Sequence, residues 1–236
     1  MNMKVTPLTG SVGASVEGIS LAESLTSEQF DQLREAFHRH CMLVFRDQHL
    51  APGPQLAFAR RWGEPMVPAL LSKLQLEGFP EVIQIRTAPK ELTSTEAWHY
   101  DAPHTPVPPK ISILSAQVVP VGGDTMWTNQ YLAYESLSPV MQRMLQGLRV
   151  HFRGARLARF QGVSGAEVPQ AVHPLVRTHP ETGRKVLEPP RVLRRLQHLR
   201  RWSYDQVKQV LTRGPRARRA HGAGASSRLP IAVGSH

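Results

Sequence analysis

The sequence predicts an α+β protein that is mainly β, built as a double-stranded β-helix, or jelly roll, with flanking helices. Many short apolar stretches of strand length recur along the chain, and glycine and proline residues separate them. The helical patterns between them are few, as expected for helices gathered at one side of a sheet. The length of 236 residues and the 41% share of hydrophobic residues suit one domain with a sizeable core.

The first elements follow from local patterns. Residues 5–21 alternate loosely between apolar and polar and contain several glycines, which favours short paired strands. A helix begins next, because Thr26 and Gln29 can form a capping box. Its inner face consists of apolar residues at helical spacing: Phe30, Leu33, Ala36 and Phe37. Residues 42–45 are an apolar run that indicates a buried strand, bounded by the polar residues 46–48.

The middle of the chain continues this alternation of strands and helices. Residues 54–62 predict a second short helix, and residues 82–85 predict another strand. Residues 110–119 are rich in β-branched side chains and favour a further strand. Ser138 can cap the next helix, with Pro139 in its first turn. The inner side of this helix is apolar and is expected in the core: Met141, Met144, Leu145 and Leu148.

A hairpin is predicted near residue 180. Residues 172–178 and 184–187 flank a turn signal at residues 180–183, and such a turn between two apolar runs favours an antiparallel pair. The single cysteine, Cys41, cannot form an internal disulfide and lies at the end of the first helical pattern. We interpret it as a small buried hydrophobic residue without a chemical role.

The basic character of the chain lies in its last part. The formal net charge is +11, and residues 188–236 contain ten Arg and one Lys against Glu188 and Asp205, a balance of +9. Residues 193–202 favour a basic amphipathic helix, whereas the last fifteen or so residues are expected to lack secondary structure. We therefore interpret residues 1–187 as the globular domain and residues 188–236 as a basic tail, partly helical or disordered.

The location of the protein can be inferred only from what the sequence lacks. No stretch approaches the roughly 20 apolar residues that a membrane span requires. Residues 1–5 also lack the apolar run of a signal peptide. We therefore expect a cytoplasmic protein without a membrane span.

The residues with the clearest chemical potential are His99 and Asp101. Side chains alternate faces along an extended segment, so these two point the same way. A neutral imidazole and a carboxylate, with one further His, form the facial triad of non-haem Fe(II) oxygenases, which leaves open positions for a co-substrate and oxygen. A bare His-x-Asp pair is weak support for a metal site, because such pairs often arise by chance.

Further motifs accompany this pair in order and with sensible spacing. They are Gly13–Gly18, Leu43–Gln48, Arg61–Glu64, Trp98–Asp101, Gly122–Thr125 and His173–Pro180. Over residues 5–187 the chain resembles the taurine/2-oxoglutarate-dependent dioxygenase (TauD/TfdA) family. The resemblance implies a jelly-roll fold and identifies His99 and Asp101 as iron ligands.

The resemblance also implies the cofactors and the reaction. In the family, 2-oxoglutarate chelates Fe(II) and is decarboxylated to succinate and CO2 while O2 oxidises a bound substrate. By resemblance, the hydroxyl of Thr125 contacts 2-oxoglutarate together with an arginine near the family's C-terminus. Without the resemblance, a threonine after Gly-Gly-Asp is equally well interpreted as a turn residue.

The expected substrate is a small organic acid, because family members oxidise sulfonates, sulfate esters and aryloxy acids. The taurine enzyme has a histidine after its Gly-Glu motif, whereas residues 65–68 of this chain contain none. An apolar part of the substrate is easier to house beside Met66, Val67 and Leu70. Nucleic acid is not an expected partner of this function, and a homo-oligomer is left open.

The third iron ligand is not evident. The family's second iron-binding histidine lies about 70 residues beyond its His-Pro motif, which falls past His236 when counted from His173. His104 follows Pro103 and is interpreted as a solvated loop residue, and His179 belongs with His173 to the hairpin motif. The remaining histidines lie in the tail or carry no argument: His49, His151, His198 and His221.

The tail allows two interpretations. After Leu187 the family continues with an apolar residue, Val and Asn, and this chain has Glu188–Arg191 instead. An arginine-rich end in place of the segment that should carry the second iron-binding histidine and the 2-oxoglutarate arginine is typical of a shifted reading frame or a truncated gene product. We then expect an incomplete jelly roll and little or no turnover of 2-oxoglutarate. The alternative is a non-catalytic protein whose basic tail binds an anionic surface or nucleic acid.

Overall fold

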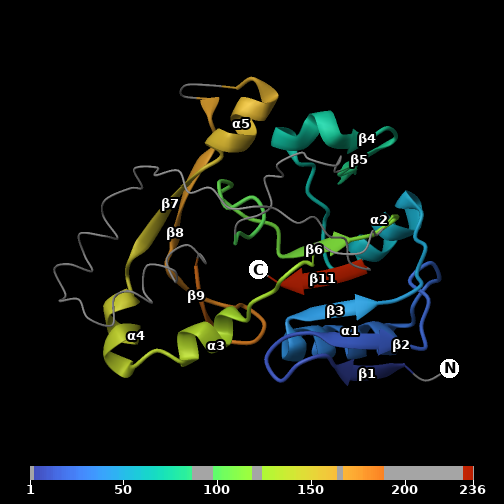
Figure 1. Cartoon of the computed structure of the whole chain (residues 1–236), viewed down its shortest axis with the longest axis horizontal. Coiled ribbons are helices and arrows are strands. Elements are labelled where there is room, and N and C mark those ends of the chain that lie inside the picture. The colour runs from blue at the N-terminus through green and yellow to red at the C-terminus, as the bar shows by residue number, and fades with distance from the viewer. Residues whose placement is uncertain (1–2, 87–97, 119–123, 164–166, 189–230, 236) are drawn as a thin grey trace.

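The largest element of the protein is a five-stranded mixed sheet with the strand order β1-β2-β3-β11-β6 (Figure 1). The computed structural model describes residues 3–86, 98–118, 124–163, 167–188 and 231–235. The strands of this sheet are β1 (Lys4–Pro7), β2 (Ala14–Glu17), β3 (Met42–Phe45), β6 (Ile111–Leu114) and β11 (Ile231–Ser235). β1 and β2 pair antiparallel, as expected for residues 5–21, and β2 and β3 pair parallel.

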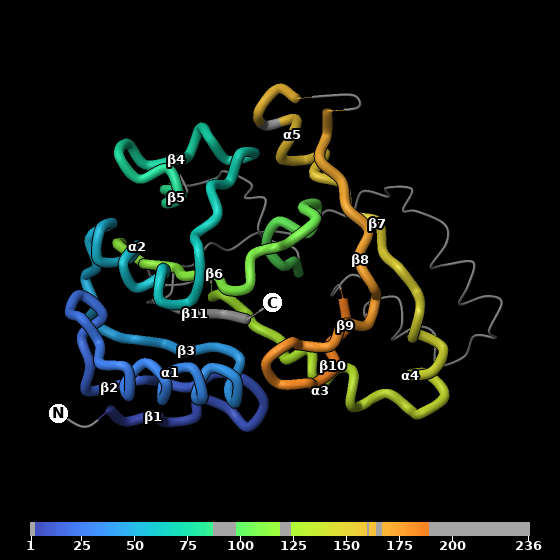
Figure 2. The backbone as a smooth tube through the Cα atoms, turned by 180° about the vertical axis from the view of Figure 1, so that it is seen from behind, coloured from blue at the N-terminus to red at the C-terminus, as the bar shows by residue number. Residues whose placement is uncertain are grey.

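The helix α1 (Ser27–His40) lies along β2 and β3, as Figure 2 shows from behind. The predicted capping box is confirmed, because the Thr26 hydroxyl accepts from the Gln29 amide and the Gln29 side chain accepts from the Thr26 amide. Cys41 ends the helix in a left-handed conformation and is buried, as expected. The core between α1 and the sheet includes the four predicted helix residues: Phe30, Leu33, Ala36 and Phe37.

The strand β11 corrects the expectation that the last fifteen or so residues lack secondary structure. Residues 231–235 pair antiparallel with both β3 and β6, with Val233 opposite Leu43 on one side and Ile113 on the other. These two short strands would each leave a row of backbone N–H and C=O groups without partners, and β11 supplies those partners. A pairing this distant in sequence cannot be recognised from local periodicity.

The second half of the described chain consists of short helices and two antiparallel ribbons. The elements are α3 (Gln130–Glu135), α4 (Pro139–Leu145), β7 (Arg149–Arg153), α5 (Ala155–Gln161), β8 (Gln170–Pro174), β9 (Val176–Thr178) and β10 (Lys185–Leu187). The predicted hairpin is confirmed by the pairing of β9 with β10. The strand expected over residues 172–178 is divided at Leu175, whose buried side chain packs against Leu145 while β8 pairs with β7. Ser138 caps α4 as predicted.

Three predicted boundaries differ from the structure. The helix α2 (Pro52–Arg60) begins two residues earlier than expected because Pro52 occupies its first turn. The 3-10 helix η1 (Ala69–Leu74) precedes the ribbon of β4 (Gln75–Leu76) and β5 (Phe79–Ile83). The strand predicted at 82–85 corresponds to β5, which begins earlier and ends two residues sooner. β6 is shorter than residues 110–119, and Val118 is 66% exposed rather than part of a strand.

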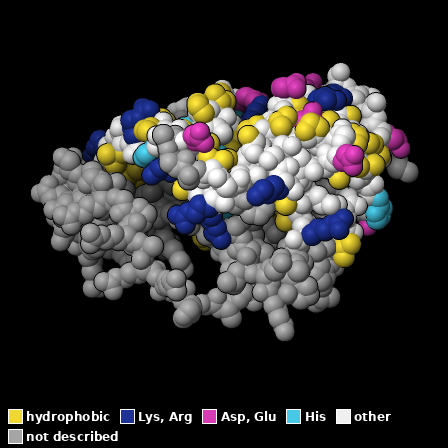
Figure 3. Space-filling model, turned by 90° about the horizontal axis from the view of Figure 1, so that it is seen from above, with side chains coloured by type: hydrophobic (Ala, Val, Ile, Leu, Met, Phe, Trp, Pro, Cys, Tyr) yellow, Lys and Arg dark blue, Asp and Glu magenta, His cyan; other side chains and the backbone are white. Residues whose placement is uncertain are grey.

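The surface of the described part carries mixed charge. Figure 3 shows Lys and Arg side chains spread over the upper face among acidic and apolar ones rather than gathered in one patch. This agrees with the small charge balance of residues 1–187. Among the described residues, no helix is long and apolar enough to cross a membrane. The tail helix predicted over residues 193–202 lies outside the described residues.

Candidate functional site

His99 and Asp101 lie on an irregular extended segment before β6, with their side chains on the same side. The distance from His99 Nε2 to Asp101 Oδ1 is 3.8 Å. Both side chains are about half exposed, at 52% and 48% of their maximal area, so both remain accessible to solutes. The structure therefore brings the two predicted metal ligands together.

The pair comes close to the spacing that one divalent metal ion requires. Bonds from imidazole nitrogen or carboxylate oxygen to a small divalent ion measure about 2.0–2.2 Å, so two donors at adjacent positions on the same ion lie roughly 3 Å apart. The separation between His99 Nε2 and Asp101 Oδ1 is 3.8 Å, so a small rotation of these half-exposed side chains would bring both donors onto one ion. Nitrogen with carboxylate oxygen is also a donor set that suits Fe(II).

The second oxygen of Asp101 is occupied by a neighbouring strand. The Ser112 hydroxyl of β6 donates to Asp101 Oδ2 over 2.5 Å. Because Oδ2 accepts this hydrogen bond, the carboxylate is oriented with Oδ1 toward His99. This contact could not be predicted from local patterns, since Ser112 is one of several polar residues in an alternating strand.

A strained turn follows Asp101. Ala102 has a φ of 45°, a left-handed conformation that residues other than Gly, Asn and Asp rarely adopt. The turn closes where the Thr105 amide and hydroxyl both donate to the Ala102 carbonyl oxygen, at 3.0 and 2.8 Å. The backbone next to Asp101 is therefore held in a conformation that its surroundings must enforce.

Tyr100, between the two ligands, is directed away from them and into the protein. Its ring meets that of Phe152 edge to face at a centroid distance of 5.6 Å. Burial raises the pKa of Tyr100 well above its ordinary value, and the negative charge of Glu188 raises it further. Glu188 in turn binds Arg177 of the His-Pro motif, with 3.0 Å between Arg177 Nη1 and Glu188 Oε1. Tyr100 thus anchors the segment from behind.

Two histidines differ from their predicted roles. His104 was expected to be solvated, but it is only 8% exposed, and Gly154 lies directly against its ring. Burial lowers its pKa below the ordinary value. His173 is also buried, and its Nε2 lies 3.0 Å from the carbonyl oxygens of both Pro103 and Thr105. Neither histidine is placed as a third metal ligand.

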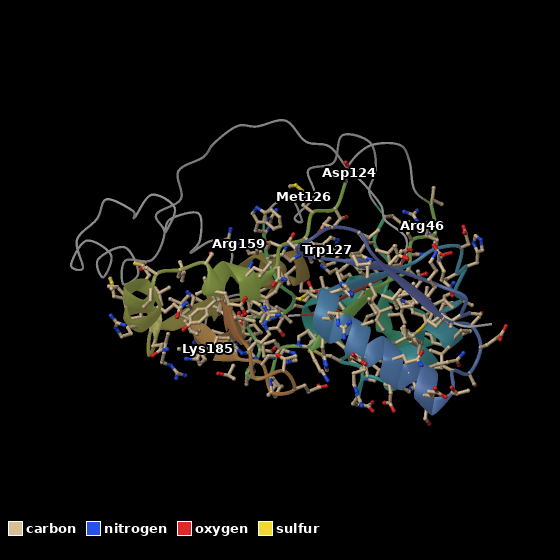
Figure 4. The ribbon with its side chains drawn as sticks, turned by 90° about the horizontal axis from the view of Figure 1, so that it is seen from below. Arg46, Asp124, Met126, Trp127, Arg159 and Lys185 are labelled. Carbon is tan, nitrogen blue, oxygen red and sulfur yellow. The ribbon has the colours of Figure 1, made fainter. Side chains whose placement is uncertain are left out.

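The rest of the predicted constellation is not assembled in the described part. There, no group of three His, Cys, Asp or Glu side chains is arranged to hold a metal ion. Thr125 is exposed in the irregular segment before α3. Of its neighbours, Asp124 and Met126 lie at the outer edge of the described chain, and Trp127 packs against Met42 and Val44 (Figure 4). The tail histidines, His198 and His221, lie outside the described residues.

Comparison with known proteins identifies relatives of most of the chain. The family described as taurine catabolism dioxygenase TauD, TfdA family matches residues 4–216, and so continues past Leu187. An (S)-phenoxypropionate/alpha-ketoglutarate-dioxygenase of Sphingobium herbicidovorans is 33% identical over 198 residues, covering 78% of this chain and 69% of that protein. An alpha-ketoglutarate-dependent sulfate ester dioxygenase of Pseudomonas putida is 29% identical over 203 residues, covering 80% of this chain and 66% of that protein.

The chain is also similar to a solved structure of a taurine dioxygenase. The crystal structure of a taurine dioxygenase from Burkholderia xenovorans matches with a TM-score of 0.69 and 31% identity, covering 99% of this chain and 80% of that chain. The aligned part of the chain spans about two thirds of the curated relatives, 69% of one and 66% of another.

Proposed function

The chain belongs to the TauD/TfdA dioxygenase family, and from this premise we propose that it is an Fe(II)- and 2-oxoglutarate-dependent dioxygenase that oxidises a small organic acid. Alpha-ketoglutarate, named for the relatives, is another name for 2-oxoglutarate. The observation that carries the proposal is the pairing of His99 Nε2 with Asp101 Oδ1 at 3.8 Å, on a half-exposed segment. One imidazole and one carboxylate on the same side are two of the three protein ligands that the metal of this family requires.

Each residue of the site has a defined task. His99 and Asp101 supply two of the three protein ligands, and Ser112 holds the Asp101 carboxylate in the orientation that leaves Oδ1 toward the metal. The hydroxyl of Thr125 is proposed to contact 2-oxoglutarate. When bound, Fe(II) and 2-oxoglutarate supply the oxidising chemistry, with succinate and CO2 as the products of the co-substrate.

The substrate class follows from the relatives and from the residues after Glu64. The two curated relatives described above act, by their names, on a phenoxypropionate and on sulfate esters. Met66 and Val67 are exposed apolar side chains, which suits an apolar substrate portion. Leu70 was expected beside them, but it is buried and packs with Ala158 and Val168. We therefore propose an aryloxy acid, sulfonate or sulfate ester with an apolar group.

The proposed architecture is the jelly roll of the family. The mixed five-stranded sheet and the β7–β8 ribbon are interpreted as parts of its two sheets. The similarity to the Burkholderia xenovorans taurine dioxygenase at a TM-score of 0.69 supports this interpretation.

Among the described residues, no third His, Cys, Asp or Glu joins His99 and Asp101 in a metal-binding group, and the 2-oxoglutarate arginine is not recognisable in the sequence. Two ligands hold an ion less tightly than three, and 2-oxoglutarate without an arginine lacks a bidentate partner. We therefore expect slow turnover. The alternative, a basic tail that binds an anionic surface, rests on residues 188–236, nearly all of which lie outside the described part.

Succinate release tests the proposed function. Purified protein is incubated with Fe(II), ascorbate, 2-oxoglutarate and oxygen, with and without aryloxy acids, sulfonates and sulfate esters. We expect slow succinate release that depends on one substrate class and disappears in His99→Ala. His151→Ala, which changes an exposed histidine on β7, should keep the rate. Equal rates in the wild type and His99→Ala would contradict the proposal.

A further inference from the structure

The buried ring of His173 contacts the backbone of the metal-ligand turn. Its Nε2 lies 3.0 Å from the Pro103 carbonyl oxygen and 3.0 Å from the Thr105 carbonyl oxygen. Two oxygens that only accept hydrogen bonds face this nitrogen, so Nε2 must carry a hydrogen and donate it. His173 is 7% exposed, and water cannot readily replace it as the partner of these carbonyl groups.

The contacted turn would not hold its shape unaided. Ala102 has a φ of 45° and follows Asp101 directly. For an alanine this conformation is less favourable than the right-handed region, because Cβ approaches the following carbonyl oxygen. The turn closes through the hydrogen bond from the Thr105 amide to Ala102, so fixing the Thr105 carbonyl also fixes the closing residue. His173 therefore acts on the part of the turn that keeps Ala102 strained.

His173 is itself fixed on a regular element. It lies on β8, and five residue pairs join β8 to β7, with His173 opposite Val150. The ring centroid of Phe152 on β7 lies 5.8 Å from that of His173 and 5.6 Å from that of Tyr100. The same ribbon thus contacts the ligand segment before Asp101, through Tyr100, and after it, through the turn.

We propose that His173 is a positioning residue for the metal site: its Nε2–H clamps the turn 102–105 and thereby sets the direction of the Asp101 carboxylate. This rests on the proposed function, because it takes Asp101 to be a metal ligand. It also assigns a physical role to the His-Pro part of the motif His173–Pro180, which the site does not otherwise use.

Donor-free and donor-retaining variants separate the clamp from simple packing. His173→Leu fills the space without a donor, and His173→Met does so with a more adaptable chain if the leucine variant does not fold. His173→Gln keeps an N–H donor at a similar reach. His151→Leu is the matched control, because His151 lies exposed on β7 and bonds only to the Gln170 side chain in the described structure. Folding of each variant is checked by circular dichroism.

Two measurements are made on the full chain: Mn(II) affinity by electron paramagnetic resonance, and hydrogen exchange of the Thr105 amide. We expect His173→Leu to weaken Mn(II) binding about tenfold and to speed Thr105 exchange, in line with other residues that support a metal ligand. His173→Gln should restore both, and His151→Leu should change neither.

The possible results distinguish the clamp from the metal site. Unchanged Thr105 exchange in His173→Leu, or a glutamine variant as impaired as the leucine one, would overturn the clamp. If exchange rises as expected but His99→Ala binds Mn(II) as tightly as the wild type, the failure belongs to the proposed metal site, and the role of His173 toward a metal falls with it.

Discussion

At the scale of single residues, sequence patterns identified features whose partners are close in the chain. Thr26 and Gln29 are three residues apart, and their capping box is formed as expected. His99 and Asp101 are two apart, and their side chains converge. His104 was misjudged, because the residue that lies against its ring, Gly154, is distant in sequence. The contacts of Ser112 and His173 were missed for the same reason.

Ser112→Ala tests the orientation of the Asp101 carboxylate. Removing the hydroxyl frees Asp101 Oδ2, so the carboxylate can rotate away from His99. We expect Mn(II) affinity to fall about tenfold, as for other groups that orient a metal ligand. The free energy of unfolding should fall by only about 1 kcal/mol. Ser115→Ala, just after the same strand, serves as the control. Unchanged affinity in Ser112→Ala would show that the hydroxyl does not orient the ligand.

Buried His104 makes stability depend on pH. Burial lowers its folded pKa below the ordinary 6.5, so the unfolded chain binds more protons as the pH falls from about 7 to 5. The free energy of unfolding should therefore decrease on acidification. The lowered pKa values of His179 and Glu181 act in the same direction. His104→Leu should flatten this slope in urea titrations at several pH values, whereas His151→Leu should not. An identical slope in His104→Leu would refute the role of His104.

At the scale of elements, strand and helix types were mostly predicted, and their ends were not. Helix α2 begins early because Pro52 suits the first turn. The strand expected over residues 172–178 divides at Leu175, because that side chain turns into the core beside Leu145. Such breaks depend on contacts between residues that are distant in sequence. The close approach of Gly154, just before α5, to Leu70 of η1 and to the His104 ring also depends on such contacts.

Gly154→Ala tests that close approach. A Cβ at Gly154 would lie 2.9 Å from Leu70 Cδ1 and 3.1 Å from the His104 ring, so the neighbours must shift. We expect a loss of about 1–3 kcal/mol in the free energy of unfolding. Gly53→Ala is the matched control, because Gly53 lies within helix α2 and its added Cβ would meet only the Phe79 side chain, at 4.0 Å. There we expect a gain of about 0.4–1 kcal/mol. An unchanged free energy of unfolding in Gly154→Ala would mean that the packing around Gly154 is looser than described.

At the scale of the whole molecule, the mainly β class was expected from the sequence, but the sheet order was not. The strand β11 inserts between β3 and β6, strands far from it in sequence. Strand pairing over such distances leaves no mark in local periodicity, and the sequence therefore suggested an unstructured end. The third ligand of the proposed metal site was not predicted either, and among the described residues no group of three His, Cys, Asp or Glu side chains is arranged to hold a metal ion.

Hydrogen exchange tests the insertion of β11. Its backbone pairs on both sides, so amides of Ala232 and Val233 should exchange as slowly as those of Leu43 in β3. The edge strand β1, which pairs only with β2 among the described strands, provides the comparison and should exchange faster. Exchange of residues 231–235 at the rate of an unstructured peptide would place them outside the sheet.

The most direct test of the site is a Mn(II) titration of the wild type, His99→Ala, Asp101→Ala and the double variant, with His151→Ala as control. If one ion binds both side chains, each single variant should lose more than the 10- to 100-fold typical of supporting residues. The double variant should then lose little more than either single one, because the losses of two ligands on one ion are not additive. Equal affinity in all five proteins would contradict a metal site at His99 and Asp101.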